Sequence, residues 1–102
     1  MELTGKQRAW LRSQATSLDT IFQIGKGGIS DEICFQLGNA LEARELIKIK
    51  LLETCPTSLK DTANEIAEKT GAEVVQTIGT KIVLYKVSSQ EKNRKIDITK
   101  IR

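Results

Sequence analysis

The chain has 102 residues, of which 39% are hydrophobic and 28% are charged, a composition typical of one folded domain with a single core. No apolar run approaches the roughly 18 residues that a membrane span needs. Because positions 2 to 8 are polar rather than signal-like, we expect a cytoplasmic protein. Two cysteines and no histidine argue against a zinc site, and nothing in the sequence points to a cofactor.

Charge is unevenly distributed along the chain, although the formal net charge is only +3. Residues 88–102 hold five basic and two acidic residues and so account for the whole excess. Residues 1–87 carry eleven of each sign, so net charge alone does not argue for a nucleic-acid partner. Basic residues dominate up to position 28 and acidic residues dominate 58–70, which predicts a basic face and a more acidic one.

The first helix is predicted to begin at Thr4, because Thr4 and Gln7 have the spacing of a capping box. Arg8 and Arg12 lie four residues apart and share one helix face, where unpaired like charges cost about 0.2 to 0.5 kcal/mol. This spacing favours an anionic partner for that face. A solvated polar face without a partner explains the same pattern equally well and remains open.

A glycine-rich loop follows a strand-like run, 20–24, and precedes a helix that Ser30 is suited to cap. The residues of this loop are Gly25, Lys26, Gly27 and Gly28. Glycine lets another backbone approach closely, and helix N–H groups together with a lysine favour a bound phosphate. Such a phosphate would belong to a nucleotide or to a nucleic-acid backbone.

Other interpretations of this loop compete with that one. The glycines can simply form a tight turn in which Lys26 is solvated. A Walker-type phosphate loop needs its lysine after the last glycine, and a dinucleotide fingerprint needs a third glycine where Ser30 stands. What remains is G-x-x-G, the short loop with which KH-type domains clamp a nucleic-acid backbone. Alone, this tetrapeptide is a weak signal.

The middle of the chain predicts a helix, a strand and another helix. Apolar residues with helical spacing between 29 and 41 indicate a helix that ends near Ala43, and a further helix follows Pro56. Residues 46–52 alternate in polarity, which places Lys48 and Lys50 on one side of a strand. These lysines suit an anionic partner, although edge strands also use lysine to prevent aggregation.

Two further strands, 73–78 and 81–87, are predicted to form a hairpin. The order α-β-α-β-α-β-β then predicts an α/β domain in which three helices accompany a four-stranded mixed sheet with parallel pairings and one antiparallel hairpin. The glycine loop lies at the carboxyl end of the first strand, where open α/β sheets bind ligands. We expect the domain to span 1–87 and residues 88–102 to form a flexible or loosely docked basic tail.

No set of residues predicts an enzyme. Without histidine, a nucleophilic Cys34 or Cys55 would lack its usual base, so both cysteines are interpreted as packing or turn residues. A small nucleotide-binding enzyme would need a metal-binding carboxylate near the loop, such as Asp31, which is better explained as favourable charge at a helix N-terminus. A protein–protein adaptor that uses apolar positions of the sheet or the tail is a further alternative.

Three segments together resemble one known family. These segments are Leu3 to Arg8, Ile24 to Ile29 and Ala40 to Lys50. Their order and spacing are similar to those of the CRM domain in its small stand-alone bacterial YhbY-like form, over residues 1–87. The resemblance implies a fold similar to the C-terminal domain of translation initiation factor three. It also implies an RNA-binding protein that associates with precursors of the large ribosomal subunit, without a membrane or a small-molecule substrate as partner.

By position, the resemblance puts the glycine loop on the RNA backbone and implies a basic surface beside it. The candidate RNA-binding residues, with Arg12 added from its helix face, are Gly25, Lys26, Gly27, Gly28, Lys6, Arg8, Arg12, Arg44, Lys48 and Lys50. The family often has a polar residue where this chain has Gly27, which removes one side chain and adds flexibility. Since aromatic residues are only 4% of the chain, we expect recognition of RNA shape and backbone rather than base stacking.

Overall fold

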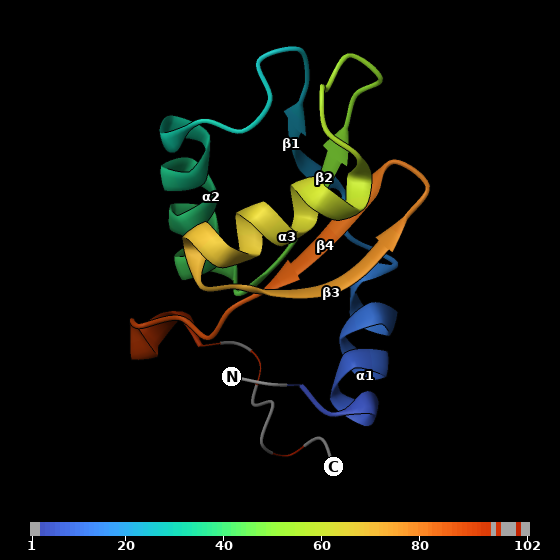
Figure 1. Ribbon diagram of the computed structural model, residues 1–102. Helices are drawn as coiled ribbons and strands as arrows, with labels where there is room; N and C mark the ends of the chain where they lie inside the picture. Colours follow the sequence, from blue (N-terminus) through green and yellow to red (C-terminus); the bar gives the residue numbers. More distant parts are fainter. Residues whose placement is uncertain (1–2, 95, 97–99, 101–102) are drawn as a thin grey trace.

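A four-stranded mixed sheet forms the middle of the protein in the computed structural model shown in Figure 1. The structure describes residues 3–94, 96 and 100. Its elements in chain order are α1 (Gly5–Ala15), β1 (Thr20–Ile24), α2 (Asp31–Arg44), β2 (Leu46–Leu51), α3 (Leu59–Thr70), β3 (Glu73–Ile78), β4 (Lys81–Tyr85) and a short 3-10 helix, η1 (Glu91–Asn93). The predicted order of helices and strands is confirmed, and η1 is an addition to it.

The strands lie in the order β1-β2-β4-β3, so β1 and β3 are the edges of the sheet. β1 is parallel to β2, whereas β4 is antiparallel to both β2 and β3. The expectation of parallel pairings therefore holds for one pair only, because β4 inserts between β2 and β3. The internal place of β2 also removes edge protection as the explanation of Lys48 and Lys50.

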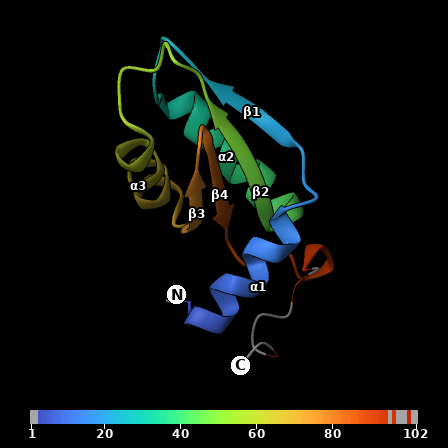
Figure 2. The ribbon, with the colours of Figure 1, turned by 90° about the vertical axis from the view of Figure 1, so that its right-hand side faces the viewer.

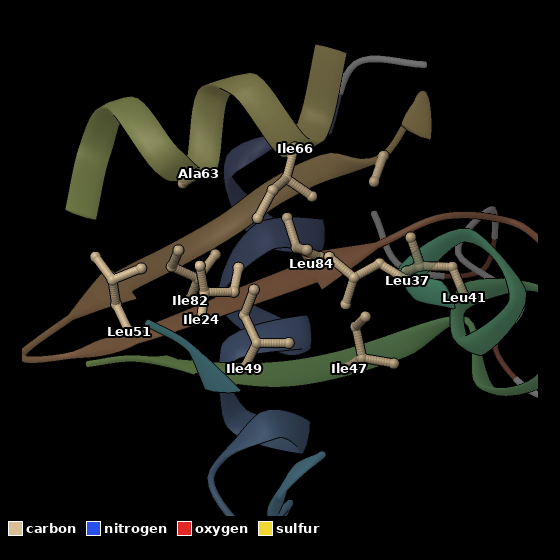
Figure 3. Close-up of a cluster of buried hydrophobic side chains, with 11 residues drawn as sticks. Ile24, Leu37, Leu41, Ile47, Ile49, Leu51, Ala63, Ile66, Ile82 and Leu84 are labelled. Carbon is tan, nitrogen blue, oxygen red and sulfur yellow. The ribbon is translucent and has the colours of Figure 1, made fainter. Parts of the chain in front are cut away.

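Helices α2 and α3 cover one face of the sheet. Ile47 and Ile49 of β2 point into this face and share a core with Leu37 of α2 and Ile66 of α3 (Figure 3). All four side chains are buried, and burial of each contributes about 1.5 to 3 kcal/mol to stability. The alternation within β2 thus directs its isoleucines to this core and its lysines to the opposite face.

Helix α1 lies on that opposite face, over the end of the sheet where β2 begins (Figure 2). Leu11 and Ala15 of α1 are buried in a second core with Leu46 and Tyr85, which are register partners on β2 and β4. The other end of this face, where β2 ends and β4 begins, carries lysines in place of apolar side chains. α1 therefore covers only part of the face.

The helix ends agree with the local signals of the sequence. The hydroxyl of Thr4 accepts the N–H of Gln7 at 3.1 Å, and the side chain of Gln7 accepts the N–H of Thr4 at 2.9 Å, which completes the predicted capping box. Ser58 caps α3, and Gly71 ends it with a left-handed φ of 77°. These ends are set by residues within one turn of the helix terminus.

The segment after β4 is docked on the carboxyl end of α2. Glu42 accepts hydrogen bonds from the backbone N–H and the hydroxyl of Ser89, at 2.9 and 2.7 Å. Glu45, which is 0% exposed, accepts the N–H of Ser88 at 2.9 Å and that of Ile96 at 3.1 Å. The beginning of the expected loose tail is therefore held by two carboxylates.

Glu45 adopts an unusual backbone conformation at the junction of α2 and β2, with a φ of 66°. A residue with a side chain rarely adopts this positive φ with a negative ψ, and the conformation costs about 1 to 3 kcal/mol. A glycine there would relax the backbone but lose both hydrogen bonds to the tail. The expectation of flexibility for the other tail residues, 95, 97–99 and 101–102, lies outside the described residues.

Candidate nucleic-acid interface

The glycine loop lies at the carboxyl end of β1, beside the loop that follows β2 (Figure 1). The N–H of Leu52 donates to the carbonyl of Ile24 at 2.8 Å, which extends the pairing of the two strands into these loops. A Cβ at Gly25 would come within 3.2 Å of the side chains of Leu52 and Thr54. The sheet therefore fixes the base of the glycine loop against its neighbour.

Gly28 closes the loop in a conformation that favours glycine. Its φ is +64°, its N–H donates to the carbonyl of Gly25 at 2.9 Å, and a Cβ would lie 3.3 Å from Cγ of Pro56. A side chain here would be strained by its own backbone and crowded by the proline. Gly28 is thus explained by the geometry of the loop itself.

The middle of the loop is open. Lys26 is exposed, and a Cβ at Gly27 would meet no atom within 4 Å. Among the residues that the structure describes, none accepts a hydrogen bond from the backbone N–H of Lys26 or of Gly27. Two available amides beside an ammonium group form a donor set that suits a phosphate.

The first turn of α2 contributes less to this donor set than the sequence suggested. The hydroxyl of Ser30 accepts the N–H of Ile33 at 3.2 Å and so occupies one of the helix N–H groups. Asp31 and Glu32 are exposed in the same turn, so the protein supplies its own negative charge to the helix dipole. A phosphate would meet the loop amides and Lys26 rather than this helix end.

A second group of cations lies on the sheet face that α1 leaves uncovered. Lys50 of β2 is opposite Lys81 of β4, and Lys48 lies two positions before Lys50 on the same face. Arg12, near the end of α1, joins Lys48 and Lys81 in lining a hollow of about 550 Å³. The importance of Lys81 is not visible in the sequence, because it depends on the strand that this lysine faces.

The two groups of cations meet at one end of the sheet. The register places Lys50 beside Gln23, which is two residues before Gly25. The turn between β3 and β4 lies at this end as well, since the N–H of Leu51 donates to the carbonyl of Thr80 at 2.7 Å. The glycine loop and the lysine face can therefore contact one continuous partner.

Two of the predicted residues lie away from the loop. Arg44 is at the opposite end of β2, where it lines a smaller hollow with Lys48 and Asp19. Lys6 is in the first turn of α1, at the far end of the molecule from the glycine loop (Figures 1 and 2). The basic surface expected beside the loop consequently holds Lys48, Lys50 and Arg12 but neither of these two.

Arg8 forms a bond within the protein. Its guanidinium donates to the carbonyl of Val74 on the edge strand β3, and its side chain is half-buried. Val74 lies at an irregularity of β3, where the register with β4 shifts before Gln76. Arg8 therefore fastens α1 to the sheet, whereas Arg12, one turn further along α1, is exposed.

Comparison with known proteins identifies the family. The model of the CRS1 / YhbY (CRM) domain matches residues 3–86. The chain belongs to this family.

Proteins similar to this chain are known from several bacteria. "Probable RNA-binding protein YqeI" of Bacillus subtilis is 49% identical over 90 residues, which cover 88% of this chain and 94% of the relative. A Haemophilus influenzae relative named "RNA-binding protein" is 33% identical over 90 residues, which cover 88% of this chain and 91% of the relative. The solution structure of SAV1595 from Staphylococcus aureus has 44% identity and a TM-score of 0.76, and the match covers 94% of this chain and 100% of that one.

The two cysteines of this CRM domain lie in different environments. Burial raises the pKa of the Cys34 thiol on α2. Burial also acts to raise the pKa of Cys55, but hydrogen bonds with Thr57 and Thr62 outweigh it and leave that pKa below its ordinary value.

Within the described residues, no three or more His, Cys, Asp or Glu side chains gather as a metal site, and no helix is long and apolar enough to cross a membrane.

Proposed function

We propose that this protein binds RNA, with the glycine loop on the sugar–phosphate backbone and the lysine face of the sheet beside it. The open loop carries this proposal, because it presents two available amides and the exposed Lys26 at the end of the sheet where Lys50 also lies. The names of the Bacillus subtilis and Haemophilus influenzae relatives, "Probable RNA-binding protein YqeI" and "RNA-binding protein", support it.

The proposed mechanism divides the phosphates between two sets of residues. The amides of Lys26 and Gly27 hold one phosphate, while four others are neutralised by the side chains of Arg12, Lys48, Lys50 and Lys81. With about five phosphates neutralised, the log–log salt dependence of the affinity has a slope of about −3.5 for a single strand and about −4.5 if B-DNA values apply to a duplex. Binding of this kind follows RNA shape and backbone.

The other candidate residues have secondary roles in this proposal. Arg8 positions α1, because its guanidinium already donates a hydrogen bond to the carbonyl of Val74. Lys6 and Arg44 lie away from the loop, so only an RNA that extends along the molecule, whose longest dimension is 39 Å, would reach them. We assign the principal contacts to the loop and to the lysine face.

We further propose that the bound RNA is ribosomal and that the protein acts in assembly of the large ribosomal subunit. The resemblance of the three sequence segments to the stand-alone bacterial members of the family supports this assignment. It requires no cofactor, no membrane and no small-molecule substrate, and it makes the precursor of the large subunit the partner.

Sedimentation of tagged protein from a cell lysate tests the ribosomal assignment. Wild type is compared with Lys26→Asp/Gly27→Asp, which puts two negative charges into the loop, and with the matched control Lys60→Asp/Asn64→Asp on the exposed surface of α3. We expect wild type and control to travel with large-subunit precursors and the folded loop variant to stay at the top of the gradient. If wild type stays at the top as well, the ribosomal assignment is wrong.

A further inference from the structure

The hollow between α1 and the end of the sheet has the dimensions of a ligand site. Its volume of about 550 Å³ is within the roughly 300 to 1,000 Å³ of small-molecule sites. Arg12 of α1 and Thr16, which follows that helix, border it on one side, and Lys48, Gln76 and Lys81 border it from three strands of the sheet. Its Lys81 side lies at the end of the sheet that carries the glycine loop, because Lys81 is opposite Lys50.

The charge of this hollow favours an anion. Arg12, Lys48 and Lys81 contribute three cations, and no acidic residue lines the hollow. Among the residues that the structure describes, no carboxylate forms an ion pair with any of these three side chains. A fourth cation, Lys50, lies directly across from Lys81, so a phosphate at the rim would relieve the repulsion between these two lysines.

The remaining lining suits a nucleobase. Val83 and Ala15, each 1% exposed, close the bottom of the hollow. Ile78 forms its apolar side and is 57% exposed, one of two large apolar side chains in the described residues with such exposure. Gln76 stands beside them on the register row of Lys48 and Val83. Its amide both donates and accepts, which allows hydrogen bonds to the edge of a base.

We propose that this hollow binds one unpaired nucleotide of the RNA. The phosphates of this nucleotide and of its neighbours lie against Arg12, Lys48 and Lys81. The face of the base contacts the exposed Ile78, and the base edge meets Gln76. This inference rests on the proposed RNA-binding function and adds to it a preference for unpaired nucleotides. A base held in a duplex cannot enter the hollow, so the protein favours single-stranded or looped RNA over a continuous helix.

Nuclear magnetic resonance of the ¹⁵N-labelled full chain tests the hollow directly. Each of the four ribonucleoside 5′-monophosphates is titrated separately, and inorganic phosphate serves as the control for a bare anion. We expect nucleotides to shift the side-chain amide of Gln76 and the backbone amides of Thr80 and Lys81, with phosphate shifting only the last two. Shifts confined to Lys26 and Gly27 for every nucleotide would overturn the assignment of the hollow.

Two variants test separately the charged and the polar residues that line the hollow. Lys81→Gln is expected to weaken binding of all single-stranded oligoribonucleotides. It should also make the log–log dependence of affinity on salt less steep, by about 0.7. Gln76→Ala is expected to reduce the discrimination between bases by about fivefold or more. Lys60→Gln removes the same charge as Lys81→Gln from α3, which covers the other face of the sheet, and should leave both properties unchanged.

The loop variant Lys26→Asp/Gly27→Asp distinguishes this inference from the proposed function. If the loop variant loses RNA while Lys81→Gln and Gln76→Ala bind like wild type, the loop clamp stands and the hollow is refuted. If wild type fails to bind any RNA, both are refuted. If both Lys81→Gln and the loop variant weaken binding, the hollow and the clamp are supported as separate contacts.

Discussion

Lys50 and Lys81 lie directly opposite each other on β2 and β4, on a sheet face whose other end is covered by α1. Like charges in this cross-strand position lower the stability of a sheet. Neither lysine has an ion-pair partner among the described residues. The arrangement is understandable if the two charges serve a bound polyanion rather than the fold.

This repulsion predicts opposite effects of one substitution on stability and on binding. Lys81→Gln should raise the free energy of unfolding by about 0.2 to 1 kcal/mol, because it removes one of the two facing charges, while it lowers the affinity for RNA. Urea unfolding checks the stability and fluorescence anisotropy checks the affinity. A destabilised Lys81→Gln variant would show that the lysine supports the sheet.

The glycine loop should respond very differently to alanine at two of its positions. Gly28→Ala should lower the free energy of unfolding by about 1 to 2 kcal/mol, because φ at Gly28 is +64° and Pro56 lies close. Gly27→Ala should leave stability within about 0.5 kcal/mol of wild type, since the space around it is open. Thermal or urea unfolding of the pair measures the contrast, and equal losses at both positions would refute this description of the loop.

Arg8 should behave as a structural residue. Arg8→Ala should lower the free energy of unfolding by about 1.5 to 3 kcal/mol, because a charged donor to the carbonyl of Val74 is lost. Arg12→Ala, on the exposed side of the same helix, is the matched control and should change stability by less than about 0.5 kcal/mol. Similar small effects of both substitutions would mean that Arg8 does not fasten α1 to β3.

The docked segment after β4 should be released by acid. Hydrogen bonds from Ser89 lower the pKa of Glu42 below its ordinary value of 4.5, and the charge of Lys86 acts in the same direction. A carboxyl group with a lowered pKa in the folded state stabilises that state above its unfolded pKa and loses this contribution as pH falls through the lowered value. The backbone amide of Ser89, followed by nuclear magnetic resonance, should therefore titrate with a midpoint below 4.5, whereas a midpoint at or above that value would contradict the contact.

Local signals in the sequence were sufficient for the elements of the fold. Each helix end depends on residues within one helical turn, so it can be predicted from the local sequence. Examples are the capping box of Thr4, the Ser58 cap and the Gly71 terminus. The alternation from 46 to 52 likewise separated the buried and the charged sides of β2. The position of the glycine loop followed from the order of these elements.

Contacts between residues that are distant in the sequence could not be predicted in the same way. The insertion of β4 between β2 and β3 makes Lys81 a neighbour of Lys50, and no local pattern carries that pairing. The bond from Arg8 to Val74 joins residues that are 66 positions apart. The hydrogen bond from Ser88 to the buried Glu45 also depends on the tertiary fold, so the sequence predicts only a flexible or loosely docked segment there.

We infer that the glycine loop holds an RNA backbone, and the affinity of the loop variant tests this claim most directly. Wild type, Lys26→Asp/Gly27→Asp and the control Lys60→Asp/Asn64→Asp are titrated with a labelled fragment of large-subunit ribosomal RNA at several salt concentrations, after circular dichroism has shown that all three are folded. We predict a salt slope of about −3.5 for wild type and control, and an affinity of the loop variant that is lower by more than about tenfold with a shallower slope. Equal affinity and equal slope for the loop variant and wild type would contradict the claim.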